Sequence, residues 1–234
     1  MTRASRDRTE PTNSVGEERS VPRLLPPKAL LRRSVLVRSL SEVPGFDEPV
    51  DRLEQVVTPP ESAAELLYEA FQRGDVSGRS VVDLGTGTGR LAIGAALLGA
   101  QPVLGVDVSP SALDIARAAA RSLGAVVEFR EGEVEGAGLP EGTVVMNPPF
   151  GAQRRHADRP FWDAALRPGR RAVYAFALSE SRTFIEGRAV ERNARIESVR
   201  PVPWRLPATF AHHRRRAVEL PVDLWVLRVG ERNG

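Results

Sequence analysis

The stretch SVVDLGTGTG, Ser80–Gly89, decides the fold of this chain. Its apolar start, interrupted only by Asp83, predicts a buried parallel strand over Ser80–Leu84. Three glycines at alternate positions then lead into a predicted helix over Arg90–Leu98. Glycine tolerates unusual backbone conformations, so a ligand can approach closely the amides at the start of that helix. A strand, a glycine turn and a helix in this order are typical of nucleotide-type sites in α/β folds.

The next predicted strand, Val103–Asp107, ends in a carboxylate about 20 residues after the turn, where an acid binds ribose hydroxyls. An Asp at a strand end is often only a helix cap, but Ser109 could fill that role instead. A helix over Ser109–Leu123 and a strand over Ala125–Phe129 follow. Glu133 then lies in a loop, where it could receive an adenine amine or be a solvated charge. Together these features predict a nucleoside cofactor site.

A second stretch, Asn147-Pro148-Pro149-Phe150, follows an apolar run over Thr143–Met146 that is typical of a buried strand. The Asn147 side-chain oxygen and the Pro148 carbonyl can accept both hydrogens of an exocyclic nucleobase amine. Such contacts draw the nitrogen towards a tetrahedral shape and stabilise positive charge that grows on it. The prolines stiffen the loop, and Phe150 offers a face on which a base can stack. The stretch alone could equally close a strand, but its place after a glycine turn favours chemistry.

The rest of the chain alternates helices with strands and contains no internal repeat. Helices are predicted over Lys28–Leu40, 61–73, Arg159–Leu166 and 179–194, and strands over Ala172–Leu178, Ile196–Trp204 and Val218–Val229. Thr58 is expected to cap the second of these helices, with Pro59 as its first residue. The pattern predicts an α/β fold with a doubly wound, seven-stranded, mostly parallel sheet. The last strand is expected to be antiparallel, because a short basic hairpin joins it to its predecessor.

Composition leaves several functional classes open and excludes others. The 234 residues are 41% hydrophobic and 27% charged, as in ordinary soluble domains, and a cytoplasmic location is expected. No apolar run approaches the roughly 18 residues of a membrane span. The absence of cysteine excludes disulfides and cysteine zinc sites. Residues 1–27 are predicted to be a disordered tail, either inert or a basic arm, and residues 28–234 a single domain with a helical extension at its start.

Two basic loops are candidate phosphate contacts, which the net charge of +3 permits without requiring. Their residues are Arg154 and Arg155, after the Asn-Pro-Pro-Phe stretch, and His213, Arg214, Arg215 and Arg216, in the hairpin. A solvated run of charge is about as good an interpretation of the hairpin. No metal is expected, because neither a cysteine nor an acid joins the histidines at ligand spacing.

The glycine turn, Asp107 and the stretch Asn147–Phe150 together resemble the sequence blocks of the class I S-adenosylmethionine-dependent amino methyltransferases. More narrowly, they resemble methyltransferase-like protein five and its archaeal relatives. The likeness covers residues 40–229 and includes Leu53-Glu54-Gln55, Leu206-Pro207-Ala208-x-Phe210 and Val222-Asp223-Leu224. The blocks near the carboxyl terminus separate this family from other Asn-Pro-Pro enzymes. The resemblance implies a Rossmann-like fold and methylation of adenine N6 in RNA, with small-subunit ribosomal RNA as the expected substrate.

The resemblance also assigns roles to individual residues. It implies that S-adenosylmethionine is bound by Gln55, Thr58, Asp83, Gly85, Gly87, Thr88, Gly89, Arg90, Asp107, Val108, Glu133 and Val134. From the residues alone, Gln55 and Thr58 would be turn and capping residues. Relatives tend to carry Asp at the position of Glu133. Asn147, Pro148, Pro149 and Phe150 would hold the target adenine, flipped out of its stack or already single-stranded.

A partner and two rival functions complete these expectations. Eukaryotic members of the family depend on a small zinc-binding activator protein, which could add a strand to the sheet edge expected at residues 125–129. One rival is methylation of a release-factor glutamine amide, because those enzymes also use Asn-Pro-Pro-aromatic. The other is a non-catalytic, cofactor-binding scaffold for ribosome assembly. The basic hairpin favours RNA over the first, and the intact stretch Asn147–Phe150 argues against the second.

Overall fold

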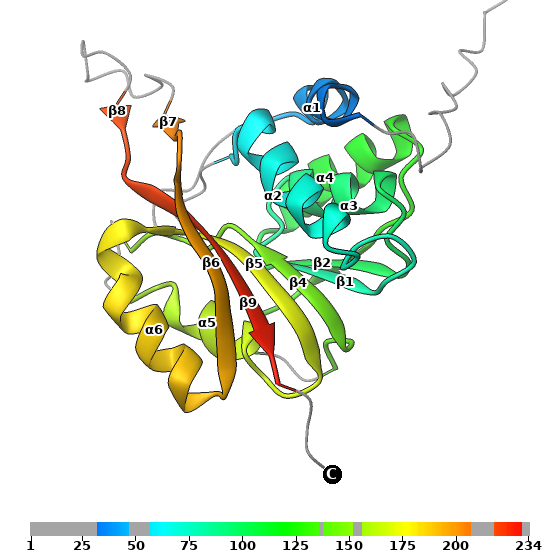
Figure 1. The fold of residues 1–234 in the computed structure, drawn as a ribbon. Helices are drawn as coiled ribbons and strands as arrows, with labels where there is room; N and C mark the ends of the chain where they lie inside the picture. The colour runs from blue at the N-terminus through cyan, green and yellow to red at the C-terminus, as the bar shows by residue number, and fades with distance from the viewer. Residues whose placement is uncertain (1–31, 47–56, 136–137, 152–155, 207–217, 231–234) are drawn as a thin grey trace, which may run out of the picture.

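A computed structural model describes residues 32–46, 57–135, 138–151, 156–206 and 218–230. Its centre is a seven-stranded sheet with the strand order β3-β2-β1-β4-β5-β9-β6 (Figure 1). The strands are β1 (Val81–Leu84), β2 (Val103–Asp107), β3 (Glu128–Glu131), β4 (Gly142–Met146), β5 (Arg170–Leu178), β6 (Ala194–Val202) and β9 (Val222–Val229). A separate two-stranded ribbon pairs β7 (Arg205–Leu206) with β8 (Val218–Glu219).

The strand directions agree with the sequence. β1 pairs in parallel with β2 and β4, and the parallel run extends to β3 and β5. β9 lies between β5 and β6 and is antiparallel to both. The prediction of a mostly parallel sheet with an antiparallel last strand is therefore confirmed. The winding reverses between β1 and β4, and ligands of open α/β sheets bind outside the carboxyl ends of the strands at such a switch point.

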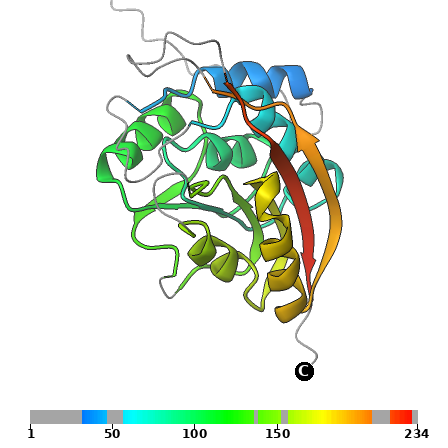
Figure 2. The ribbon, with the colours of Figure 1, turned by 90° about the vertical axis from the view of Figure 1, so that its left-hand side faces the viewer.

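Helices cover both faces of the sheet, four on one face and two on the other (Figures 1 and 2). They are α1 (Arg33–Ser41), α2 (Pro60–Gln72), α3 (Arg90–Leu97) and α4 (Pro110–Ser122) on the first face, and α5 (Arg159–Ala165) and α6 (Arg182–Glu191) on the second. A 3₁₀ turn at Ser179–Ser181 precedes α6. Within the described residues, no helix has the length and apolar character needed to cross a membrane.

The strands that lie between the two helical layers supply side chains to both. Along β9, Leu224 and Val226 belong to the core beneath α1–α3, while Trp225 and Leu227 belong to the core beneath α5 and α6. This alternation follows from the two-residue period of a strand.

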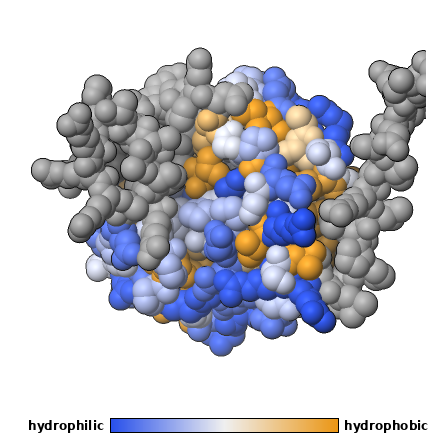
Figure 3. All heavy atoms as spheres, turned by 90° about the horizontal axis from the view of Figure 1, so that it is seen from above, coloured by the Kyte–Doolittle hydropathy of each residue, from blue (hydrophilic) through white to orange (hydrophobic). Residues whose placement is uncertain are grey.

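Seen from above, the described surface shows apolar patches interspersed with hydrophilic residues (Figure 3).

Several predicted boundaries are wrong, and three of them have a local reason. α2 begins at Pro60, and Pro59 rather than Thr58 occupies its N-cap position without a capping side chain. β3 starts at Glu128 rather than Ala125, because the Ala125 amide still donates to the Ala120 carbonyl at the end of α4. The strand expected over Val218–Val229 is split into β8 and β9 on either side of Leu220-Pro221, where proline lacks a backbone donor.

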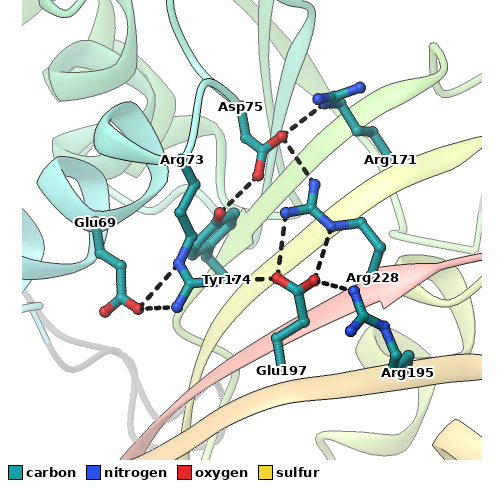
Figure 4. Close-up of polar contacts among 8 residues, drawn as sticks. All are labelled: Glu69, Arg73, Asp75, Arg171, Tyr174, Arg195, Glu197 and Arg228. Atoms are coloured by element: carbon teal, nitrogen blue, oxygen red, sulfur yellow. Dashed lines mark hydrogen bonds and ion pairs between the residues drawn. The ribbon is translucent and has the colours of Figure 1, made fainter.

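A network of charged side chains joins α2 to the antiparallel part of the sheet (Figure 4). At its centre is Asp75, which is fully buried in the loop before β1. Its carboxylate accepts hydrogen bonds from Arg171 Nε (2.6 Å), Tyr174 Oη (2.7 Å) and Arg228 Nη1 (2.9 Å). Burial acts to raise the pKa of Asp75, but the bonds from Arg228, Tyr174 and Arg171 outweigh it and hold the pKa below its ordinary value. Arg228 also contacts Glu197 of β6, so one cluster links the loop before β1 to the strands β5, β6 and β9.

Candidate active site

The glycine turn lies at the carboxyl end of β1, where the switch point of the sheet predicts a ligand. Gly85, Gly87 and Gly89 have φ values of 68°, 53° and 88°, in a region that favours glycine. Asp107, at the end of β2, accepts from the Gly87 amide at 2.8 Å and so helps to fix the turn. The Ser109 hydroxyl accepts a hydrogen bond from the Ala112 amide and so caps α4, a role that the sequence allows for either Asp107 or Ser109.

A cavity of about 280 Å³ opens over this turn, at the carboxyl ends of β1, β2 and β4. Its lining includes these residues singled out from the sequence: Thr58, Asp83, Gly85, Gly87, Thr88, Arg90, Asp107, Val108, Glu133, Val134, Asn147 and Pro149. Gly89, Pro148 and Phe150 are described but do not belong to that lining. Outside the described residues lie Gln55, Arg154, Arg155, His213, Arg214, Arg215 and Arg216. The structure thus brings the two stretches, well separated in sequence, to one cavity.

The lining residues that were not predicted as site residues include Phe46, His156, Pro160 and Phe161. The ring of Phe161 lies against the turn, since a Cβ on Gly85 would be 2.7 Å from it. The ring of Phe46 approaches Gly87 in the same way, at 3.0 Å. Two aromatic rings therefore fill the space that the glycines leave open. In the sequence, isolated phenylalanines in loops and short helices carry no signal that separates such a wall from ordinary core.

Three buried polar atoms of the lining residues have no hydrogen-bond partner in the described structure: Asp83 Oδ1, Arg90 Nε and Asn147 Oδ1. Leaving a buried donor or acceptor unpaired costs about 1–3 kcal/mol, so such a group in a cavity points to a ligand. Burial raises the pKa of Asp83 to about 7, although hydrogen bonds from Thr86 and the Ala92 amide act to lower it. Burial also lowers the pKa of the Arg90 guanidinium. A buried carboxyl group and a buried guanidinium group thus line the same cavity.

The stretch Asn147–Phe150 is held from both ends. Asn147 Nδ2 donates to Thr58 Oγ1 at 3.0 Å, while Asn147 Oδ1 has no partner among the described residues. The Phe150 ring packs edge-on against Trp204, with 5.7 Å between ring centroids. Trp204 in turn packs on Phe176 of β5 at 4.9 Å. The half-buried Phe150 ring therefore has a fixed support from the end of β6.

This fold and this site define a Rossmann-like methyltransferase. A relative in Drosophila melanogaster, rRNA N(6)-adenosine-methyltransferase Mettl5, is 33% identical over 216 residues, which are 86% of this chain and 99% of the relative. The chain belongs to the Mettl5 family of rRNA N6-adenosine methyltransferases. The resemblance that the sequence blocks carry is therefore confirmed.

Further comparisons agree with this family. The Danio rerio rRNA N(6)-adenosine-methyltransferase METTL5 is 33% identical over 197 residues, with 79% of this chain and 92% of the relative covered. A crystal structure from Pyrococcus horikoshii, described as a candidate RNA methyltransferase, is 36% identical with a TM-score of 0.78, covering 86% of this chain and all of that one. The family model for ribosomal protein L11 methyltransferase (PrmA) matches residues 63–129. That shorter match holds the glycine turn and Asp107 but stops before Asn147.

Proposed function

We propose that this chain transfers the methyl group of S-adenosylmethionine to N6 of an adenine in small-subunit ribosomal RNA, in the cytoplasm. The observation that carries the proposal is Asn147 Oδ1, a buried acceptor without a described partner, in a cavity shared with the glycine turn. An adenine amine can donate to this atom. The relatives named as rRNA N6-adenosine methyltransferases support adenine in ribosomal RNA as the acceptor class.

The residues around the turn fit S-adenosylmethionine, which supplies an electrophilic methyl group when bound. Its amino-acid part carries an ammonium and a carboxylate, which complement the buried carboxylate of Asp83 and the buried guanidinium of Arg90. Asp107 ends β2 where an acid binds ribose hydroxyls. Glu133 and Val134 would frame the adenine of the cofactor. Gln55, outside the described residues, is proposed as a further contact from the family resemblance alone.

The acceptor side of the cavity explains how an unreactive amine becomes a nucleophile. Asn147 Oδ1 and the Pro148 carbonyl would accept the two N6 hydrogens, so that the nitrogen lone pair leaves conjugation with the ring. The same oxygens stabilise the positive charge that develops on nitrogen, and they do so without rearranging. Phe150, supported by Trp204, would stack on the flipped base. No base is needed before attack, because the proton leaves afterwards.

The pKa of about 7 at Asp83 predicts that cofactor affinity depends on pH. A bound ammonium favours the ionised carboxylate, so S-adenosylmethionine should bind about tenfold more weakly at pH 5.5 than at pH 7.0. The unliganded protein has the opposite trend: a raised pKa contributes stability while the group is protonated, and this stability is lost as the pH rises through 7. Calorimetric titration at both pH values measures the effect. Asp83→Asn should bind weakly at both, and a pH-independent wild-type affinity would contradict the assignment.

The test of the proposed function is transfer of labelled methyl to deproteinised small-subunit RNA, followed by nucleoside analysis. Label in N6-methyladenosine is the expected result. Label that appears in release-factor protein and not in RNA would identify the acceptor as a glutamine amide. Cofactor binding without any label in either acceptor would favour a scaffold. RNA affinity measured at increasing salt concentration tests the proposed phosphate contacts of Arg154, Arg155 and 213–216. A variant that lacks one phosphate-binding side chain should show a weaker dependence of RNA affinity on salt than the wild type.

A partner is the second part of the proposal. Among the described strands, β3 lies at the edge of the sheet and pairs only with β2, and an edge strand offers unpaired backbone groups to an incoming strand. We propose that a small zinc-binding activator protein adds its own strand there, as the family resemblance implies. Co-expression and co-purification should yield a heterodimer in which the amides of Glu128–Glu131 gain protection from hydrogen exchange. Purification of this chain alone from the co-expression would count against the pairing.

A further inference from the structure

Thr58 and Asn147 are 89 residues apart in sequence, yet their side chains form a hydrogen bond in the wall of the cavity. Asn147 Nδ2 donates to Thr58 Oγ1 at 3.0 Å. Both residues line the cavity, and Thr58 is buried. The Thr58 hydroxyl does not cap α2, so it is available for this contact.

In this bond the Nδ2 end of the Asn147 amide faces Thr58, and the Oδ1 end is left without a described partner. An asparagine side chain has one donor end and one acceptor end, and an adenine amine that donates its hydrogens needs the acceptor. With Nδ2 engaged by Thr58, Oδ1 is left as the free atom, and it is buried without a described partner. The opposite orientation would set an N–H group against the N–H groups of the amine. Correct orientation of this one amide is therefore a condition for the proposed reaction.

Thr58 is itself held on both sides. Its carbonyl accepts a hydrogen bond from the Arg90 guanidinium, which reaches across from the start of α3. Pro59 and Pro60 follow it, and their fixed φ angles limit movement of the segment that enters α2. The Thr58 side chain is thus held in place and is not a mobile surface group.

We infer that Thr58 is a positioning residue for methyl transfer, which acts by orienting the Asn147 amide. The inference rests on the proposed function of Asn147. It differs from the family expectation that Thr58 contacts the cofactor, because the two roles affect different kinetic quantities. Loss of a cofactor contact weakens cofactor binding, whereas loss of amide orientation lowers kcat with the cofactor still bound.

The test compares Thr58→Val with Thr58→Ser. Valine has nearly the shape of threonine but offers no acceptor, whereas serine keeps the hydroxyl. Thr58→Val should lower kcat by about 10–100-fold, since a catalytic group that is poorly oriented loses activity on that scale. Its dissociation constant for S-adenosylmethionine should stay within about twofold of wild type, and Thr58→Ser should retain kcat within a few-fold.

A spectroscopic measurement without cofactor reports on the bond itself. The side-chain amide resonance of Asn147, identified by its loss in Asn147→Ala, should shift in Thr58→Val and stay in place in Thr58→Ser. Thr143→Val is the matched control, because Thr143 is a buried threonine on β4, the strand that precedes Asn147, and it does not line the cavity. Its hydroxyl donates to the Asp75 carbonyl at 2.7 Å. This control should lower stability while kcat and the Asn147 resonance remain unchanged.

Several outcomes would overturn the inference. One is a Thr58→Val enzyme with wild-type kcat and an unmoved Asn147 resonance. Another is a Thr58→Val enzyme that binds S-adenosylmethionine poorly but turns over normally when saturated, which would make Thr58 a cofactor contact. A wild-type enzyme that does not methylate adenine would overturn the proposed function instead, and this inference with it.

Discussion

Replacing Asn147 with alanine is expected to lower kcat for adenine methylation by about 10²–10³-fold, the loss typical of removing one preorganised electrostatic contact. The affinity for S-adenosylmethionine should remain close to that of the wild type. The reason is the division of the cavity lining: Asn147 follows β4, whereas the described groups proposed to hold the cofactor lie at or after the carboxyl ends of β1, β2 and β3. Quantitative nucleoside analysis gives the rate, and calorimetry gives the affinity.

Asn147→Asp is the control for shape. A carboxylate keeps two acceptor oxygens at this position, and the Thr58 hydroxyl can donate to one of them. This variant should therefore retain more activity than Asn147→Ala. An alanine variant that no longer binds the cofactor would show that Asn147 belongs to the cofactor half of the site. An alanine variant with wild-type kcat would remove Asn147 from the reaction.

The parts of the fold that were predicted correctly depend on local patterns. The run Val81–Leu84 followed by alternating glycines fixes a strand, a turn and a helix, because only glycine adopts those φ values cheaply. The antiparallel direction of β9 could be predicted from the basic segment before it, which indicates a hairpin, and the ribbon of β7 and β8 lies in that connection. The position of β3 at a sheet edge followed from the usual order of such sheets, and the structure confirms it.

The parts that could not be predicted depend on contacts between distant segments. Thr58 has the type and spacing of a helix cap, yet its hydroxyl is engaged by Asn147, which follows β4 and lies 89 residues away in sequence. Phe161 looks like an ordinary helix residue, and only the fold places its ring over Gly85. Asp75, in a Gly-Asp-Val loop, gives no hint that three side chains from β5 and β9 converge on it.

Asp75→Ala is expected to destabilise the protein by about 3 kcal/mol, the lower end of the cost of breaking a buried ion pair. The change leaves Tyr174 Oη and the Arg228 guanidinium without their buried acceptor. The lower end applies because the Arg171 side chain is 44% exposed, so that water can solvate its guanidinium once the carboxylate is removed. Since the pKa of Asp75 is held below its ordinary value, its contribution is present above about pH 4 and is lost as the pH falls through the folded-state pKa. Denaturant unfolding of both proteins at pH 7 and at acidic pH measures both effects.

Asp114→Ala on α4 is the matched control, because Asp114 forms an ion pair with Arg117 at 2.9 Å, the same length as the Asp75–Arg228 pair. The Asp114 side chain is 76% exposed and that of Asp75 is fully buried, so the two pairs match in length but differ in burial and in the further bonds to Asp75. The control should cost less than about 1 kcal/mol. Equal losses would mean that pair length rather than burial sets the energy. Because Asp75 precedes β1 and the glycine turn follows it, the folded fraction of Asp75→Ala should keep its kcat, whereas a matching loss of kcat would show that the two ends of the sheet are coupled.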